Sequence, residues 1–139
     1  MKYDNQLRYA INIIEDYDGR MPLSAWLKDF YRANKQMGSR DRKTVSEMVY
    51  GFYRLGHNEF SSTEERIKAF INISDSLPEV KAYFFPEGKQ DDKIDYQKIF
   101  PFKELLSEGI HAEEFARSFL IQPNLFLRVR PGKKQGVIE

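Results

Sequence analysis

The spacing of apolar residues constrains this chain more than any other feature of its sequence. From Tyr3 to Tyr17, apolar side chains recur three and four residues apart, which is the period of an amphipathic helix with one buried stripe. The same period returns over residues 22–37 and 40–55, with Ser39 as the expected N-cap of the second of these helices. It returns again after Ser61 or Ser62, either of which can cap a helix. The sequence therefore predicts an all-α fold.

The second half of the chain indicates shorter helices. One is expected after Pro78, because proline is tolerated in the first turn of a helix. Others are expected over residues 99–106 and from His111 to Ile121, with Phe119 turned inward. His111 is at the N-cap position of the latter, so we expect a capping or surface role for it rather than metal binding. Residues 86–97 are polar and rich in turn formers, so we expect a surface loop there. The length of 139 residues fits one compact domain, which we place at residues 1–121.

The period changes near the C-terminus. Leu125, Leu127 and Val129 alternate with Phe126, Arg128 and Arg130, a period of two that is typical of a β-strand. A lone strand is unstable because its backbone groups have no ladder partner. We therefore interpret residues 122–139 as a strand and linker. The strand pairs with a sheet in residues that follow Glu139 or in a partner, or else the segment is an extended arm packed on the helices.

Basic residues gather in one stretch, although the whole chain is nearly neutral. The chain holds 22 Lys and Arg against 21 Asp and Glu, a formal net charge of +1. Residues 20–56 nevertheless hold eight basic and three acidic residues. Salt screens charges beyond roughly 10 Å, so this local excess matters more to a polyanionic partner than the total charge does. The stretch is either a nucleic-acid surface or a solvated helix face.

The candidate RNA-contacting residues come from this stretch and from the C-terminal segment. Arg40 and Lys43 lie three residues apart at the predicted start of a helix, where backbone N–H groups also attract phosphate. Arginine suits phosphate because its planar fork donates two parallel hydrogen bonds. Arg42 can instead pair with Asp41 inside the protein, and both roles stay open. The complete set is Arg32, Lys35, Arg40, Arg42, Lys43, Arg54, Arg128 and Arg130.

We find no catalytic, cofactor or metal site in the sequence. The absence of cysteine excludes thiolate ligands and cysteine nucleophiles, and the eight glycines do not have the spacing of a phosphate-binding loop. No apolar run approaches the roughly 20 residues that cross a membrane. The first residues also lack the apolar stretch of a secretory signal. We expect a soluble cytoplasmic protein.

Several motifs resemble one known family. Residues 38–43 (Gly-Ser-Arg-Asp-Arg-Lys) and 47–54 (Glu-Met-Val-Tyr-Gly-Phe-Tyr-Arg) resemble the N-terminal region of the bacterial Sun/Fmu (RsmB/NOP-type) ribosomal RNA cytosine methyltransferases. Residues 105–110 are in keeping with that region, and residues 122–130 resemble the entry to the family's catalytic half. The family pattern there ends in Arg-Val-Asn, whereas this chain has Arg130 in the Asn position. The resemblance covers nearly the whole chain.

This resemblance implies both a fold and a role. Residues 1–121 are expected to form a helical bundle similar to the RNA-binding antitermination factor NusB. Residues 122–139 are expected to lead into a methyltransferase domain that is absent from this chain. In the family that domain binds S-adenosylmethionine and methylates C5 of cytosine through a cysteine. The implied partners are ribosomal RNA and the missing methyltransferase domain, and this chain itself would hold no cofactor.

Two other functions stay open at this point. The chain could be a free-standing NusB-like adaptor that binds RNA together with a protein. It could also be a structural module whose apolar faces pack on a catalytic domain and whose basic face binds nothing specific. The unpaired strand favours a larger enzyme or the structural module, whereas the basic stretch favours either RNA-binding function.

Overall fold

The computed structural model describes residues 2–91, 93–122 and 131–132 of the chain. Over these residues it contains α-helices and one 3-10 turn but no strand, which confirms the predicted all-α class. The predicted strand at residues 125–130 lies outside the described residues. The elements are α1 (Tyr3–Asp16), α2 (Leu23–Ala33), α3 (Ser39–Arg54), α4 (Thr63–Ile73), α5 (Pro78–Phe84), α6 (Tyr96–Ile99), the 3-10 turn η1 (Lys103–Leu105) and α7 (Ala112–Ser118).

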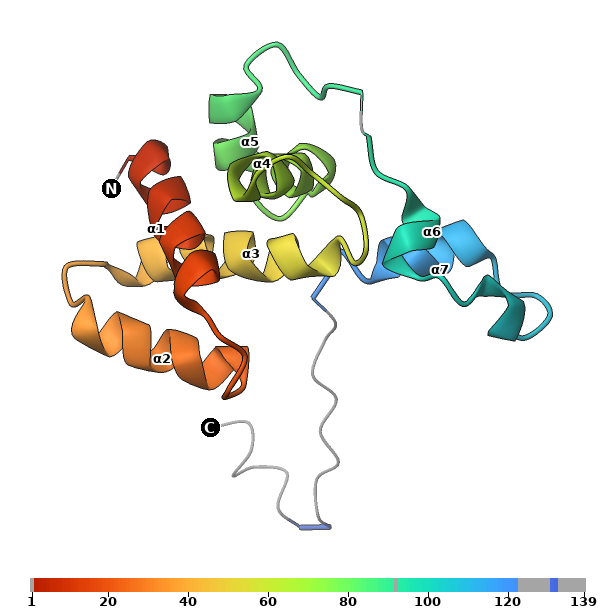
Figure 1. Ribbon diagram of the computed structural model, residues 1–139, viewed down its shortest axis with the longest axis horizontal. Helices are drawn as coiled ribbons and strands as arrows, with labels where there is room; N and C mark the ends of the chain where they lie inside the picture. Colours follow the sequence, from red (N-terminus) through yellow and green to blue (C-terminus); the bar gives the residue numbers. More distant parts are fainter. Residues whose placement is uncertain (1, 92, 123–130, 133–139) are drawn as a thin grey trace.

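Helix α3 is the element on which α1 and α4 pack. In Figure 1 it runs through the middle of the molecule, with α1 crossing it, α2 on one side and α4 and α5 on the other. Val45, Met48 and Val49 of α3 are completely buried, as the apolar spacing predicts. They join Leu7 and Ile13 of α1 in the main hydrophobic core. The helices at the C-terminal end, α6 and α7, lie beyond the end of α3 (Figure 1).

A glycine near the C-terminal end of α3 permits a close contact between α3 and α4. Gly51 is buried, and a Cβ atom built on it would lie 2.1 Å from Cδ1 of Phe70, a fully buried residue of α4. Glycine inside a helix costs roughly 1 kcal/mol relative to alanine. The close packing of the Phe70 ring on the α3 backbone offsets that cost. Gly51 is therefore required by tertiary packing rather than by helix formation.

An arginine from α4 closes the C-terminal end of α3. The guanidinium of Arg66 donates hydrogen bonds to the carbonyl oxygens of Phe52 (2.7 Å), Gly56 (2.6 Å) and Asn58. Only the Phe52 carbonyl belongs to the last turn of α3, whereas Gly56 and Asn58 follow the helix. A cation is favourable there, beside the negative end of the helix dipole. Burial lowers the pKa of Arg66. Gly56 takes a positive φ of +59°, which turns the chain away from α3.

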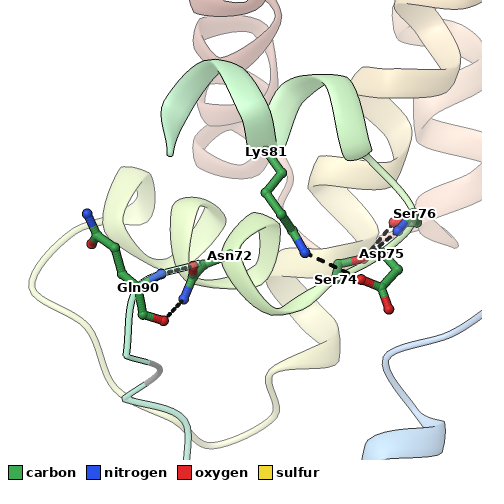
Figure 2. A network of polar contacts seen from close by, with 6 residues as sticks. All are labelled: Asn72, Ser74, Asp75, Ser76, Lys81 and Gln90. Atoms are coloured by element: carbon green, nitrogen blue, oxygen red, sulfur yellow. Dashed lines mark hydrogen bonds and ion pairs between the residues drawn. The ribbon is translucent and has the colours of Figure 1, made fainter. Parts of the chain in front are cut away.

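Two buried asparagines anchor the connection between α5 and α6, which the sequence predicts as a surface loop. Asn72 of α4 donates to the backbone oxygen of Gln90 (3.0 Å) and accepts from its N–H group (2.9 Å), as Figure 2 shows. The side chain of Asn58 makes the same pair of bonds with the backbone of Asp95. Most of the described loop residues are exposed, but Ile94 is buried in a second hydrophobic cluster. The loop is thus held at two points, by Asn72 of α4 and by Asn58 of the connection between α3 and α4.

A short polar turn, residues 74–77, joins α4 to α5 and lies at the right of Figure 2. Ser74 and Ser76 share a hydrogen bond of 2.7 Å between their hydroxyl oxygens, and the Ser76 N–H also donates to the Ser74 hydroxyl (Figure 2). Lys81 of α5 reaches back to Asp75 at 3.4 Å. These contacts stop α4 and start α5 at Pro78, where the sequence predicts a helix.

Three predicted details of the helices are wrong. The N-cap of α3 is Gly38 rather than Ser39, and it makes no side-chain hydrogen bond. The predicted helix over residues 99–106 is broken because Pro101 disfavours helical geometry in the residue before it, and Phe100 is extended. Phe119, expected to be inward, is 44% exposed because α7 has few helices to pack on. Other caps are confirmed: Ser62 accepts from the N–H of Glu65, and His111 from that of Glu114.

Replacing Gly51 tests the packing of α4 on α3. We expect Gly51→Ala to lower the free energy of unfolding by about 2 kcal/mol, because overpacking a filled core outweighs the better helix propensity of alanine. Urea denaturation followed by circular dichroism measures the change. In the double variant Gly51→Ala/Phe70→Leu, the smaller side chain relieves the overlap, so the loss should be less than the sum of the two single losses. Additive losses would contradict this account.

Candidate nucleic-acid interface

A buried tyrosine fixes the corner between α2 and α3. The Tyr31 hydroxyl donates to the backbone oxygen of Arg42 (3.1 Å) and lies 2.8 Å from the hydroxyl of Ser46. Burial raises the pKa of Tyr31, so the phenol stays neutral and able to donate. The Nε of Arg42 donates to the backbone oxygen of Met37 (2.8 Å) and so holds the connecting loop against α3. These contacts join the end of α2 and the connecting loop to α3, and we call residues 28–43 the α2–α3 corner.

The corner carries most of the cations that the sequence predicts to contact RNA. Arg32, Lys35, Arg40 and Lys43 are all exposed. Lys35 lies in the connecting loop, and Arg40 and Lys43 lie in the first turns of α3. Lys35, Arg40 and Lys43 make no ion pair with any described residue, whereas Arg32 lies 3.4 Å from Asp29. The exposure of these four side chains leaves them able to reach an anion.

Lys28 is a fifth exposed cation that we did not single out from the sequence. It lies one helical turn before Arg32 on α2, so the two side chains share a face. The spacing of four residues between Lys28 and Arg32 in the sequence could have identified Lys28. With Lys28 included, five exposed basic residues lie between residues 28 and 43.

The two acidic residues of the corner have different partners, Asp29 a cation of the corner itself and Asp41 a residue of α1. Asp29 pairs with Arg32, and Asp41 accepts a hydrogen bond of 2.8 Å from the side-chain amide of Gln6 in α1. Asp41 is only half-buried, but its contact with α1 draws it toward the helix interface. Asp41 therefore binds α1 rather than forming the internal pair with Arg42 that the sequence left open. The corner keeps a clear excess of positive charge.

Lys43 borders a groove of about 500 Å³ between α3 and α5. Glu47 and Glu79 also line this groove, but both have partners. Glu47 lies 2.8 Å from Arg54, and Glu79 accepts a hydrogen bond of 3.1 Å from the hydroxyl of Tyr3. That hydrogen bond raises the pKa of Tyr3. The groove is thus of mixed charge, and Lys43 marks the edge of the basic surface.

Arg42 and Arg54 have intramolecular partners. Arg42 holds the corner loop through Met37, as described above. The Arg54 side chain is only 13% exposed, pairs with Glu47 and donates to the side-chain oxygen of Gln122 at 2.8 Å. Its guanidinium also lies over the Tyr50 ring, 5.9 Å from the centroid. These contacts give both arginines structural roles. The remaining two predicted residues, Arg128 and Arg130, lie outside the described residues.

Other sites were sought in the described part of the chain. Its His, Asp and Glu side chains form no group of three or more that could hold a metal ion. None of its helices is both long and apolar enough to cross a bilayer. His111 caps α7, and the backbone N–H of His57 donates to the carbonyl of Lys98 at 2.9 Å. What the described side chains offer is a surface that can bind an anion.

Single substitutions separate the structural arginines from the surface cations. We expect Arg54→Ala to lower the free energy of unfolding by about 2 kcal/mol, because it leaves the largely buried Glu47 carboxylate without its partner. Lys43 is an exposed residue of the same helix, so Lys43→Ala should leave the midpoint of urea unfolding unchanged. Equal losses in the two variants would show that the distinction between them is wrong.

Comparisons with protein-family models, with curated proteins and with solved structures find no match for this chain. A function must therefore be argued from the chain's own residues. The observation with most weight is the exposed basic corner between α2 and α3.

Proposed function

We propose that this chain is a NusB-like RNA-docking domain, with the α2–α3 corner as its RNA-binding surface. The observation that carries the proposal is that five cations of the α2–α3 corner are exposed. These are Lys28, Arg32, Lys35, Arg40 and Lys43. A polyanion is the partner that such a surface favours, since each phosphate it neutralises releases counterions from the nucleic acid.

The contacts at this corner are suited to phosphate rather than to bases. Arg32 and Arg40 each offer a planar fork for two phosphate oxygens, and Lys28, Lys35 and Lys43 act as point charges. The N-terminus of α3, next to Arg40, adds the positive end of a 16-residue helix. Such contacts set the position and direction of an RNA strand without reading its sequence. The domain therefore docks RNA and leaves selection of the target base to another site.

We further propose that the parent protein is an S-adenosylmethionine-dependent ribosomal RNA cytosine-C5 methyltransferase of the cytoplasm. Support comes from the motifs at residues 38–43, 47–54 and 122–130, which resemble that family. Within this proposal, S-adenosylmethionine and the cysteine that attacks cytosine belong to the domain entered by residues 122–139. The helical domain then holds the RNA beside the catalytic domain, an arrangement in which remote binding positions the reacting base.

RNA binding by the corner can be measured directly. We expect Arg40→Ala/Lys43→Ala to weaken binding of a fluorescent RNA stem-loop similarly for unrelated loop sequences, because phosphate contacts carry no sequence information. Each phosphate contact contributes a slope of roughly 0.7 to 0.9 to the plot of log affinity against log salt. The double variant should therefore flatten that slope by about 1.4 to 1.8. Fluorescence anisotropy over a salt series measures both quantities.

The matched control removes two exposed cations elsewhere. Lys98→Ala/Lys103→Ala changes the net charge by the same amount but lies on α6 and η1, beyond the C-terminal end of α3 and away from the corner. Its salt slope should stay close to that of the unchanged protein. Equal affinity of the corner variant and the unchanged protein at low salt would rule out the proposed surface.

The methyltransferase proposal predicts the molecular mass of the endogenous protein. We expect the endogenous protein, measured by intact mass spectrometry, to be several times heavier than the 16.5 kDa of this chain, because a catalytic domain follows the helical one. An endogenous protein that ends at Glu139 would contradict the methyltransferase proposal. The proposed RNA surface would then belong to a free-standing adaptor.

A further inference from the structure

A groove on α1 lies beside the α2–α3 corner. It has a volume of about 350 Å³ and is lined by Asn5, Arg8, Tyr9 and Asn12, and we call it the α1 groove. These residues occupy positions i, i+3, i+4 and i+7 of the helix, so they share one face. Tyr9 is half-buried and the other three are exposed. None of the four is acidic, so the lining carries one positive charge, that of Arg8.

The tyrosine of the α1 groove is attached to the corner. Its hydroxyl accepts a hydrogen bond of 2.9 Å from the side-chain amide of Gln36, which follows Lys35 in the connecting loop. The Tyr9 ring makes an edge contact with Phe30 of α2, with centroids 6.3 Å apart, and packs at the margin of the main core. The ring is therefore held in place while part of its surface lines the groove.

The charges along α1 give the groove a direction. Arg8 makes no ion pair with any described residue. Asp4, one turn before it, accepts a hydrogen bond from the hydroxyl of Tyr83 in α5. Glu15 and Asp16 follow at the C-terminal end of the helix, where they repel an anion. The part of the groove at Arg8 is therefore the part that suits a phosphate.

The ligand that uses the whole groove is an unpaired nucleotide. Aromatic rings stack on bases of any sequence, and arginine binds the neighbouring phosphate. The side-chain amides of Asn5, Asn12 and Gln36 offer donors and acceptors to the edge of a base. In duplex RNA the faces of a base are covered by its neighbours, so it cannot lie on the Tyr9 ring. A duplex would therefore use Arg8 alone.

We propose that the α1 groove is a base-stacking subsite of the RNA surface, in which one unpaired base lies on the Tyr9 ring and the adjoining phosphate lies on Arg8. The strand continues from there past Gln36 to Lys35 and Arg40 of the corner. This inference rests on the proposed RNA binding and adds the class of RNA, a single-stranded segment such as a loop. Stacking accepts any base, so the subsite agrees with a surface that does not read sequence.

Binding of a single strand and of a duplex tests the subsite. The probes are a short fluorescent single-stranded RNA and the duplex with its complement, each titrated with the full chain at low salt. We expect tighter binding of the single strand. Tyr9→Leu should weaken single-strand binding about tenfold, because stacking on one base is lost, and should leave duplex binding unchanged. Tyr9→Phe keeps the ring and should bind as the unchanged protein does.

Arg8 provides a second variant at an exposed position, where the fold is not at risk. Arg8→Ala should lower the salt slope for the single strand by roughly 0.7, the contribution of one phosphate contact. Lys103→Ala removes one exposed cation of η1 and is the matched control, with an unchanged slope. Photocrosslinking with the same RNA carrying 5-iodouridine, followed by mass spectrometry, should mark Tyr9 as the crosslinked residue.

The subsite and the proposed function fail in different ways. Suppose that Arg40→Ala/Lys43→Ala weakens single-strand binding but Tyr9→Leu and Arg8→Ala do not. The subsite is then wrong, and the corner remains the RNA surface. Equal affinity for single strand and duplex, or crosslinks confined to residues outside the α1 groove, would also overturn the subsite. No binding of either RNA at low salt would overturn the proposed function and this inference with it.

Discussion

The contact between Gly51 and Phe70 sets how closely α4 packs on α3. Because Gly51 has no side chain, the Phe70 ring lies on the backbone of α3, and α4 packs closely against it. From α4, Arg66 binds the Phe52 carbonyl near the end of α3, and Asn72 holds the loop that leads to α6. The absence of a side chain at Gly51 thus allows α4 to carry Arg66 and Asn72 to their partners.

The structure divides the basic residues into two groups with different tasks. Arg42, Arg54 and Arg66 donate to backbone or side-chain oxygens and hold helices and loops in place. The exposed cations of the α2–α3 corner have few or no such partners and are the ones available to a polyanion. Charge along the sequence does not distinguish the groups. The groups differ in whether an oxygen atom of the protein lies within hydrogen-bonding distance of the basic side chain.

Much of the helical content could be predicted because apolar spacing directly reflects one-sided burial. The errors occur where local signals compete. The apolar run near Phe100 predicts a helix, but Pro101 prevents it. Phe119, at the end of α7, is 44% exposed rather than buried in the core. In the candidate site, Arg40 and Lys43 could be identified from their place at a helix start. The partners of Arg54 could not, because pairing with Gln122 joins residues 68 positions apart.

Mapping the RNA-contacting amides by NMR tests the central claim most directly. A ¹⁵N-labelled full chain is titrated with a short RNA stem-loop at low salt, and the chemical shift of each backbone amide is followed. The account predicts that the largest changes fall between Lys28 and Lys43, while residues 96–121 change little. Changes centred on residues 96–121, or no changes at low salt, would contradict the account.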